Sequence, residues 1–158
     1  MIDAIVFGEL DLPPVGPHDL DACVAEDRSN AFCLRSWSAQ DRAELQDWDG
    51  HNCWCNPPFS MILAILRRFL FCKRRSPHGT AATFVIPEWE EQSFFLLVTS
   101  LPKVFKLLRR FERGTALFTA PALRGGGRTY WGETRWPVRV YRVGPAPVTW
   151  EPSALTAC

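Results

Sequence analysis

The sequence predicts an α/β domain in which helices pack on the faces of a β-sheet. Residues 80–86 (TAATFVI) form a continuous apolar, β-branched run, as expected for a strand buried on both faces. Residues 60–72 repeat apolar side chains with the period of a helix. Strand-like and helix-like segments alternate along the chain, which favours an α/β layer structure. At 158 residues the chain is long enough for one domain with a sizeable core.

The predicted elements before residue 60 are short and separated by turns. An apolar run begins at residue 4, and the prolines of residues 13–17 break it. A short strand is expected over residues 18–25, one or two helical turns within 29–45, and a second strand over 53–56. Asp21 and Asn56 then fall at predicted strand ends. In open α/β sheets ligands bind outside the carboxyl ends of strands, so the sheet is expected to bring these two residues to one rim.

The predicted helix over residues 60–72 has a wide apolar face, and Arg67, Arg68 and Lys73 are expected to point to solvent. The strand over 80–86 is stopped by a proline, and acidic residues suit the start of a helix over 88–101. Further strands are expected over 104–111, over 115–119, and over 137–143 as an edge or half-buried strand. The predicted domain covers residues 1–143, and the Pro-rich tail 144–158 is expected to be disordered.

The net charge of +1 argues for no particular partner, but the charges are unevenly distributed. Basic residues gather after residue 66, so this part of the chain either faces phosphate or forms solvated surfaces; the sequence leaves both open. Seven tryptophans and eleven phenylalanines suit a base-stacking surface and a packed core equally well. The basic residues in question are Arg67, Arg68, Lys73, Arg74, Arg75, Lys103, Lys106, Arg109, Arg110, Arg113, Arg124, Arg128, Arg135, Arg139 and Arg142.

The six cysteines do not predict a metal site. Cys53 and Cys55 lack the usual zinc-ligand spacing, and no second Cys/His pair completes a set of four ligands. Nothing resembles a signal peptide, so we expect free thiols in a reducing, intracellular compartment. The longest apolar runs are far shorter than a membrane span. His18, His51 and His78 lie near turn residues and are expected to be ordinary loop histidines, with His51 a weak candidate for lining a site.

Asn56-Pro57-Pro58-Phe59 is the segment with the clearest chemistry. Two adjacent prolines fix the backbone twice and remove two amide donors, which leaves a rigid corner with free carbonyls. The Asn56 side-chain oxygen and the Pro57 carbonyl can accept the two hydrogens of a planar amino group, and Phe59 can stack on its ring. A loop that merely contains two prolines is the alternative, in a chain with 13 of them.

The motif and its neighbours resemble the phage-type Dam family of DNA N6-adenine methyltransferases and the Dam-like domains of some retrotransposons. The resemblance spans about residues 5–120 and rests on four segments in order: Asp19-Leu20-Asp21-Ala22-Cys23, Asn30-Ala31, Asp47-Trp48 and residues 54–60. It implies a Rossmann-like fold, S-adenosylmethionine as methyl donor and adenine in DNA as substrate. Carried over, Asn56, Pro57, Pro58 and Phe59 form the catalytic corner, and Asp21, Ala22, Cys23 and Asp47 bind the cofactor. For Asp21 the contact is the methionine amino group or the ribose hydroxyls, and for Asp47 the adenine edge.

The sequence departs from the family pattern in two places. No Gly-x-Gly loop is present, and Ala22-Cys23-Val24-Ala25 stands there instead; Phe59 replaces the commoner tyrosine. Sequence preference is expected to come from the Gly-rich loop at 124–129 with Tyr130 and Trp131. Two rivals stay open: a methyltransferase for another planar amino group (RNA adenine, cytosine N4 or glutamine amide), and an inactive nucleic-acid-binding module of a mobile element. The target sequence and the oligomeric state are not determined.

Overall fold

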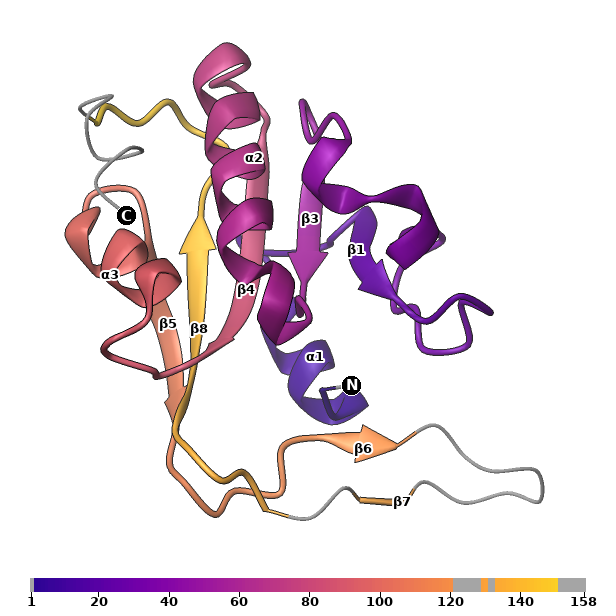
Figure 1. The fold of residues 1–158 in the computed structure, drawn as a ribbon. Coiled ribbons are helices and arrows are strands. Elements are labelled where there is room, and N and C mark those ends of the chain that lie inside the picture. The colour runs from indigo at the N-terminus through magenta and orange to yellow at the C-terminus, as the bar shows by residue number, and fades with distance from the viewer. Residues whose placement is uncertain (1, 121–128, 131–132, 151–158) are drawn as a thin grey trace.

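Six strands form one mixed sheet in the order β2-β1-β3-β4-β8-β5 (Figure 1). The computed structural model describes residues 2–120, 129–130 and 133–150, and of residues 119, 120, 129 and 130 only the backbone. β1 to β4 are parallel to one another, and β8 runs antiparallel between β4 and β5. The predicted α/β class is therefore confirmed. The strands are β1 Leu20–Val24, β2 Arg35–Ser38, β3 Asn52–Cys55, β4 Ala81–Pro87, β5 Lys106–Phe111 and β8 Val138–Val143.

Three helices and a small two-stranded ribbon complete the described fold. The helices are α1 Ala4–Leu10, α2 Ile62–Arg75 and α3 Ser93–Ser100, and short 3₁₀ turns span Ala39–Asp41 (η1), Ala43–Leu45 (η2) and Phe59–Met61 (η3). β6 (Thr119–Ala120) and β7 (Thr129–Tyr130) pair with each other outside the main sheet (Figure 1). None of the helices in the described ranges is long and apolar enough to cross a membrane.

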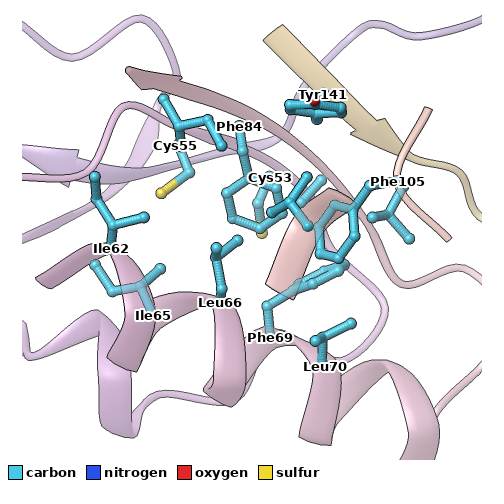
Figure 2. Close-up of a cluster of buried hydrophobic side chains, with 14 of the residues drawn as sticks. Cys53, Cys55, Ile62, Ile65, Leu66, Phe69, Leu70, Phe84, Phe105 and Tyr141 are labelled. Atoms are coloured by element: carbon cyan, nitrogen blue, oxygen red, sulfur yellow. The ribbon is translucent and has the colours of Figure 1, made fainter. Parts of the chain in front are cut away.

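The main core lies between the sheet and the helices α2 and α3. Successive side chains of a strand point to opposite faces, so Phe84 and Ile86 of β4 face the helices while Val85 faces the other side. Phe69 and Leu66 of α2 meet Phe84 in this layer (Figure 2). All seven residues of β4 are buried, which confirms the predicted strand. Each such side chain contributes about 1.5–3 kcal/mol through burial.

The N-terminal segment covers the opposite face of the sheet. Phe7 of α1 stacks on Phe32 at 4.2 Å between ring centroids, and both rings meet the indole of Trp54 edge-on. Beside them lies a polar network built on His18, which lies in a loop before β1, as expected, but is buried and bonded rather than an ordinary loop histidine. Its Nδ1 lies 2.6 Å from Asp11 Oδ1 and its Nε2 lies 2.8 Å from Thr83 Oγ1. Burial lowers the pKa of His18 despite the neighbouring Asp11 carboxylate, so the buried network holds a neutral imidazole.

Several predicted elements differ from the observed ones because long-range pairing decides them. The segment 29–45 contains the edge strand β2 as well as its 3₁₀ turns, since Arg35 and Ser36 pair with β1. The helix expected over 88–101 starts only at Ser93. The strand expected over 137–143 is not an edge strand. It lies between β4 and β5, which explains its nearly complete burial.

The chain beyond Gly144 is held against the fold as far as residue 150. Gly79 N donates to the Pro145 carbonyl at 2.9 Å. Lys73, which was expected to point to solvent, is instead fully buried, and its Nζ lies 2.7–2.8 Å from four backbone carbonyl oxygens, two of them in this segment. Trp150 packs against the main core. The expected disorder is thus not found for residues 144–150, and residues 151–158 lie outside the described part of the chain. The Gly-rich loop likewise lies mostly outside it.

Candidate active site

A cavity of about 830 Å³ opens where the strand order reverses. From β1 the chain moves to one side to form β2 and then to the other side to form β3, so the carboxyl ends of β1 and β3 diverge. This switch point is where open α/β sheets bind their ligands. The cavity is lined by Ala22, Cys23, Val24, Ala25, Asn30, Ser38, Ala39, Ala43, Glu44, Asn56, Pro57, Pro58, Phe59, Met61, Ile65 and Phe118.

The corner after β3 forms one wall of the cavity. Pro57 is buried, and Pro58 has an extended backbone (φ −62°, ψ 144°) that leads directly into η3. The Pro58 carbonyl accepts a hydrogen bond from Met61 N at 2.9 Å, which ties the corner to the start of α2. No hydrogen bond joins the Asn56 side chain to another residue of the described chain. Its carbonyl and amide groups are therefore available to a ligand in the cavity.

Three aromatic rings meet at the mouth of the cavity. Phe59 is 53% exposed, and its ring lies 4.9 Å from Trp89 and 5.5 Å from Trp136. The two indoles are 4.9 Å apart and nearly perpendicular. Trp89 follows β4 and Trp136 precedes β8, so three chain segments hold this cluster. Phe59 consequently keeps a solvent-facing side beside Asn56, while its other contacts fix its orientation.

The end of β1 forms the opposite wall. Ala22, Cys23, Val24 and Ala25 line it, and the Ala25 amide donates to Asn30 Oδ1 at 2.7 Å, which holds the loop that follows. Small side chains here let a ligand approach the backbone closely, a role that glycine fills in other sites. Ala22 and Cys23, which were predicted to bind the cofactor, thus line the same cavity as Asn56.

Asp21 lies next to this wall but does not line the cavity. It is the second residue of β1 and not its last, because the apolar residues that follow continue the strand. Its carboxylate accepts a hydrogen bond from the Phe32 amide at 3.1 Å. Burial raises the pKa of Asp21 to about 6, although backbone hydrogen bonds partly oppose this. The expected position of Asp21 at a strand end was wrong.

Asp47 and Glu44 are close in sequence, but only Glu44 lines the cavity. Asp47 is exposed and pairs with Arg68 and Arg75, each at 2.9 Å, beside a second hollow that His51 also lines. Glu44 sits in η2, just after Arg42, whose backbone is left-handed (φ 57°). This turn directs the segment to the cavity, and its conformation has no local sequence signal. The sequence reasoning assigned no site role to three polar residues that line the cavity: Asn30, Ser38 and Glu44.

Several of the basic residues after residue 66 pair with carboxylates of the same chain. Glu88 accepts hydrogen bonds from Arg110 Nε at 2.6 Å and Arg139 Nε at 2.7 Å, and these contacts lower its pKa to about 2. Arg109 pairs with Glu9. These arginines are held in ion pairs, whereas the exposed Arg135, beside the aromatic cluster, pairs with no carboxylate of the described residues. Arg124 and Arg128 lie outside the described residues.

The comparison with protein families bears directly on this site. Residues 4–93 match the family model described as DNA N-6-adenine-methyltransferase (Dam), which covers more than half of the chain. The chain belongs to the Dam family. Both walls of the cavity lie within the matched region, whereas Phe118 and Trp136 lie beyond it. Dam membership supports DNA adenine methylation as the general activity, with S-adenosylmethionine as methyl donor and DNA as substrate. No curated protein matches the chain.

Proposed function

We propose that this Dam-family chain transfers a methyl group from S-adenosylmethionine to N6 of adenine in DNA, at the corner Asn56–Phe59 of a Rossmann-like sheet. The observation that carries the proposal is the cavity at the switch point, where the corner faces the end of β1. The single antiparallel strand β8 beside the parallel strands is compatible with such a sheet. In duplex DNA the adenine must leave the stack to reach this cavity.

The cavity suits the methyl donor in size and in chemistry. Small-molecule sites usually enclose about 300–1,000 Å³ and combine an apolar lining with a few polar groups. Here Ala22, Val24, Met61 and Ile65 supply the apolar lining, and Asn30, Ser38 and Glu44 the polar groups. When bound, S-adenosylmethionine supplies an electrophilic methyl group on a sulfonium.

The corner residues orient the amine that accepts the methyl group. The Asn56 side-chain oxygen and the Pro57 carbonyl accept its two hydrogens, and Phe59 stacks on the adenine ring. As N6 becomes tetrahedral its hydrogens become more acidic, so these hydrogen bonds strengthen in the transition state. The rigid Pro57-Pro58 backbone fixes both acceptors before the substrate arrives, which lowers the entropic cost of alignment.

We assign the acidic contact with the cofactor to Glu44, because it lines the cavity, ahead of the predicted Asp47. A charge-assisted hydrogen bond between the Glu44 carboxylate and the cofactor should contribute about 1.5–3 kcal/mol to the free energy of binding. Glu44→Gln should therefore weaken the binding of S-adenosylhomocysteine in calorimetry by about 10-fold to 150-fold. Asp47→Asn is the matched control and should bind normally. If Asp47→Asn weakened binding and Glu44→Gln did not, Asp47 would be the acidic contact. Asp21, which binds the Phe32 amide, remains a predicted cofactor residue for the same assay.

Asn56→Ala tests the proposed function itself. The variant keeps both prolines, so the backbone corner is retained while the acceptor is lost. Methyl transfer to adenine-containing DNA should fall by about 10²–10³, as for loss of one preorganised polar contact, while S-adenosylhomocysteine binding changes little. If the wild type binds the cofactor but labels no DNA, RNA or protein, the proposed enzyme function is refuted in favour of an inactive binding module.

A further inference from the structure

Two cysteine thiols meet at the wall of the cavity. Cys23 Sγ on β1 lies 3.8 Å from Cys55 Sγ on β3. Both are free, and their strands are neighbours in the sheet. Cys55 immediately precedes Asn56, and Cys23 itself lines the cavity.

Cys23 and Cys55 differ from the other cysteines of the described chain. Cys23 is half-buried and faces the cavity, so a small reagent that enters the cavity can reach its sulfur. Cys55 is fully buried, and burial raises the pKa of its thiol. The Cys55 thiol therefore stays protonated until the Cys23 sulfur has been oxidised. Cys33 is also half-buried, but its Sγ contacts the His18 carbonyl and no other thiol of the described residues, and burial raises its pKa to about 12.

We propose that Cys23 and Cys55 are a modification site: a hydroperoxide oxidises them to a reversible disulfide that closes the cavity. A disulfide has an S–S distance of about 2.0 Å, so the sulfurs must approach each other by about 1.8 Å. Small movements of two strand ends supply this approach. The closure of the cofactor cavity rests on the proposed function, whereas formation of the bond does not.

The oxidation proceeds in two balanced steps. The Cys23 sulfur attacks one oxygen of hydrogen peroxide and the O–O bond breaks, which gives a sulfenic acid and one water that carries the thiol proton. The Cys55 sulfur then attacks the Cys23 sulfur and the S–O bond breaks, releasing hydroxide that takes the Cys55 proton as a second water. The two thiols lose two electrons and the peroxide gains them. A dithiol reductant reverses the change.

The new bond would act on the site through its position in the chain. It joins the residue before Asn56 to the wall formed by Ala22 and Ala25, so both walls of the cavity are drawn together. A misplacement of about 1 Å in a preorganised site can cost on the order of 100-fold in rate. Cofactor binding and methyl transfer should therefore both fall in the oxidised protein.

The test treats the full chain with hydrogen peroxide and then alkylates it under denaturing conditions for peptide mass spectrometry. We expect a linked peptide pair that contains Cys23 and Cys55, lighter by two hydrogens and cleaved by dithiothreitol. Cys33→Ser, the matched control, should form the same link, and Cys23→Ser should not. Peroxide-treated protein without a Cys23–Cys55 link would overturn the proposal, since this readout needs neither activity nor a variant.

A second measurement separates the modification from its consequence. Calorimetry with S-adenosylhomocysteine should show affinity reduced by at least about tenfold in the linked wild type and restored by dithiothreitol. For Cys23→Ser, the affinity measured after peroxide should equal the affinity of the same variant before peroxide, whatever that starting value is, because no link can form. Unchanged affinity in the linked protein would refute the closure. A reduced protein that binds no S-adenosylhomocysteine would instead refute the proposed function, while the peptide evidence for the disulfide would stand.

Discussion

Replacing Phe59 with alanine should separate the role of this ring in DNA binding from its role in the fold. Half of the ring faces solvent, and the rest contacts Trp89 and Trp136. Two aromatic contacts of this kind contribute about 1–3 kcal/mol to stability. Stacking on a base contributes about 1–3 kcal/mol, so the Kd for an adenine-containing oligonucleotide should rise by roughly 5-fold to 150-fold.

Phe71 provides a matched control on α2. It is 51% exposed, close to the 53% of Phe59, and lies under the guanidinium groups of Arg68 and Arg75 at 5.2 and 5.3 Å. Two exposed cation–π contacts contribute about 1–2 kcal/mol, so Phe71→Ala should destabilise the fold as much as Phe59→Ala. Urea unfolding measures stability, and fluorescence anisotropy with a labelled oligonucleotide measures binding. Equal loss of DNA affinity in the two variants, or no loss in Phe59→Ala, would refute the stacking role.

Three further predictions concern charge. Burial lowers the pKa of His18 in the folded state, so folding favours the neutral imidazole. The contribution of His18 to stability is therefore present above the unfolded pKa of about 6.5 and is lost as the pH falls below it. His18→Gln should flatten the pH dependence of urea unfolding below that pH. Lys73→Met removes an ammonium group that lies within hydrogen-bonding distance of four carbonyl oxygens. It should lower the unfolding free energy by about 3–5 kcal/mol, and an unchanged urea midpoint would contradict this. Arg135→Gln should make the slope of log DNA affinity against log salt shallower by about 1, and an unaltered slope would exclude a phosphate contact.

Local patterns in the sequence were sufficient to predict β4, α2 and the corner that joins β3 to α2. The apolar run of β4 and the helical face of α2 indicated buried elements because these patterns depend only on neighbouring residues. The double proline likewise determined a rigid corner between β3 and α2, since its effect on the backbone is local. The resemblance to the Dam family rested on four segments between residues 19 and 60, one of which contains the double proline, and all four lie within the matched residues 4–93.

Tertiary structure alone decided which side chains share the cavity and the order of the strands. β8 became a central strand through pairing with β4 and β5, which its alternating sequence could not specify. Glu44 reaches the cavity through a left-handed residue between two 3₁₀ turns, while Asp47 pairs with two arginines of α2. Contacts between segments far apart in the chain depend on how the whole sheet closes over its core, and no short window of sequence contains that information.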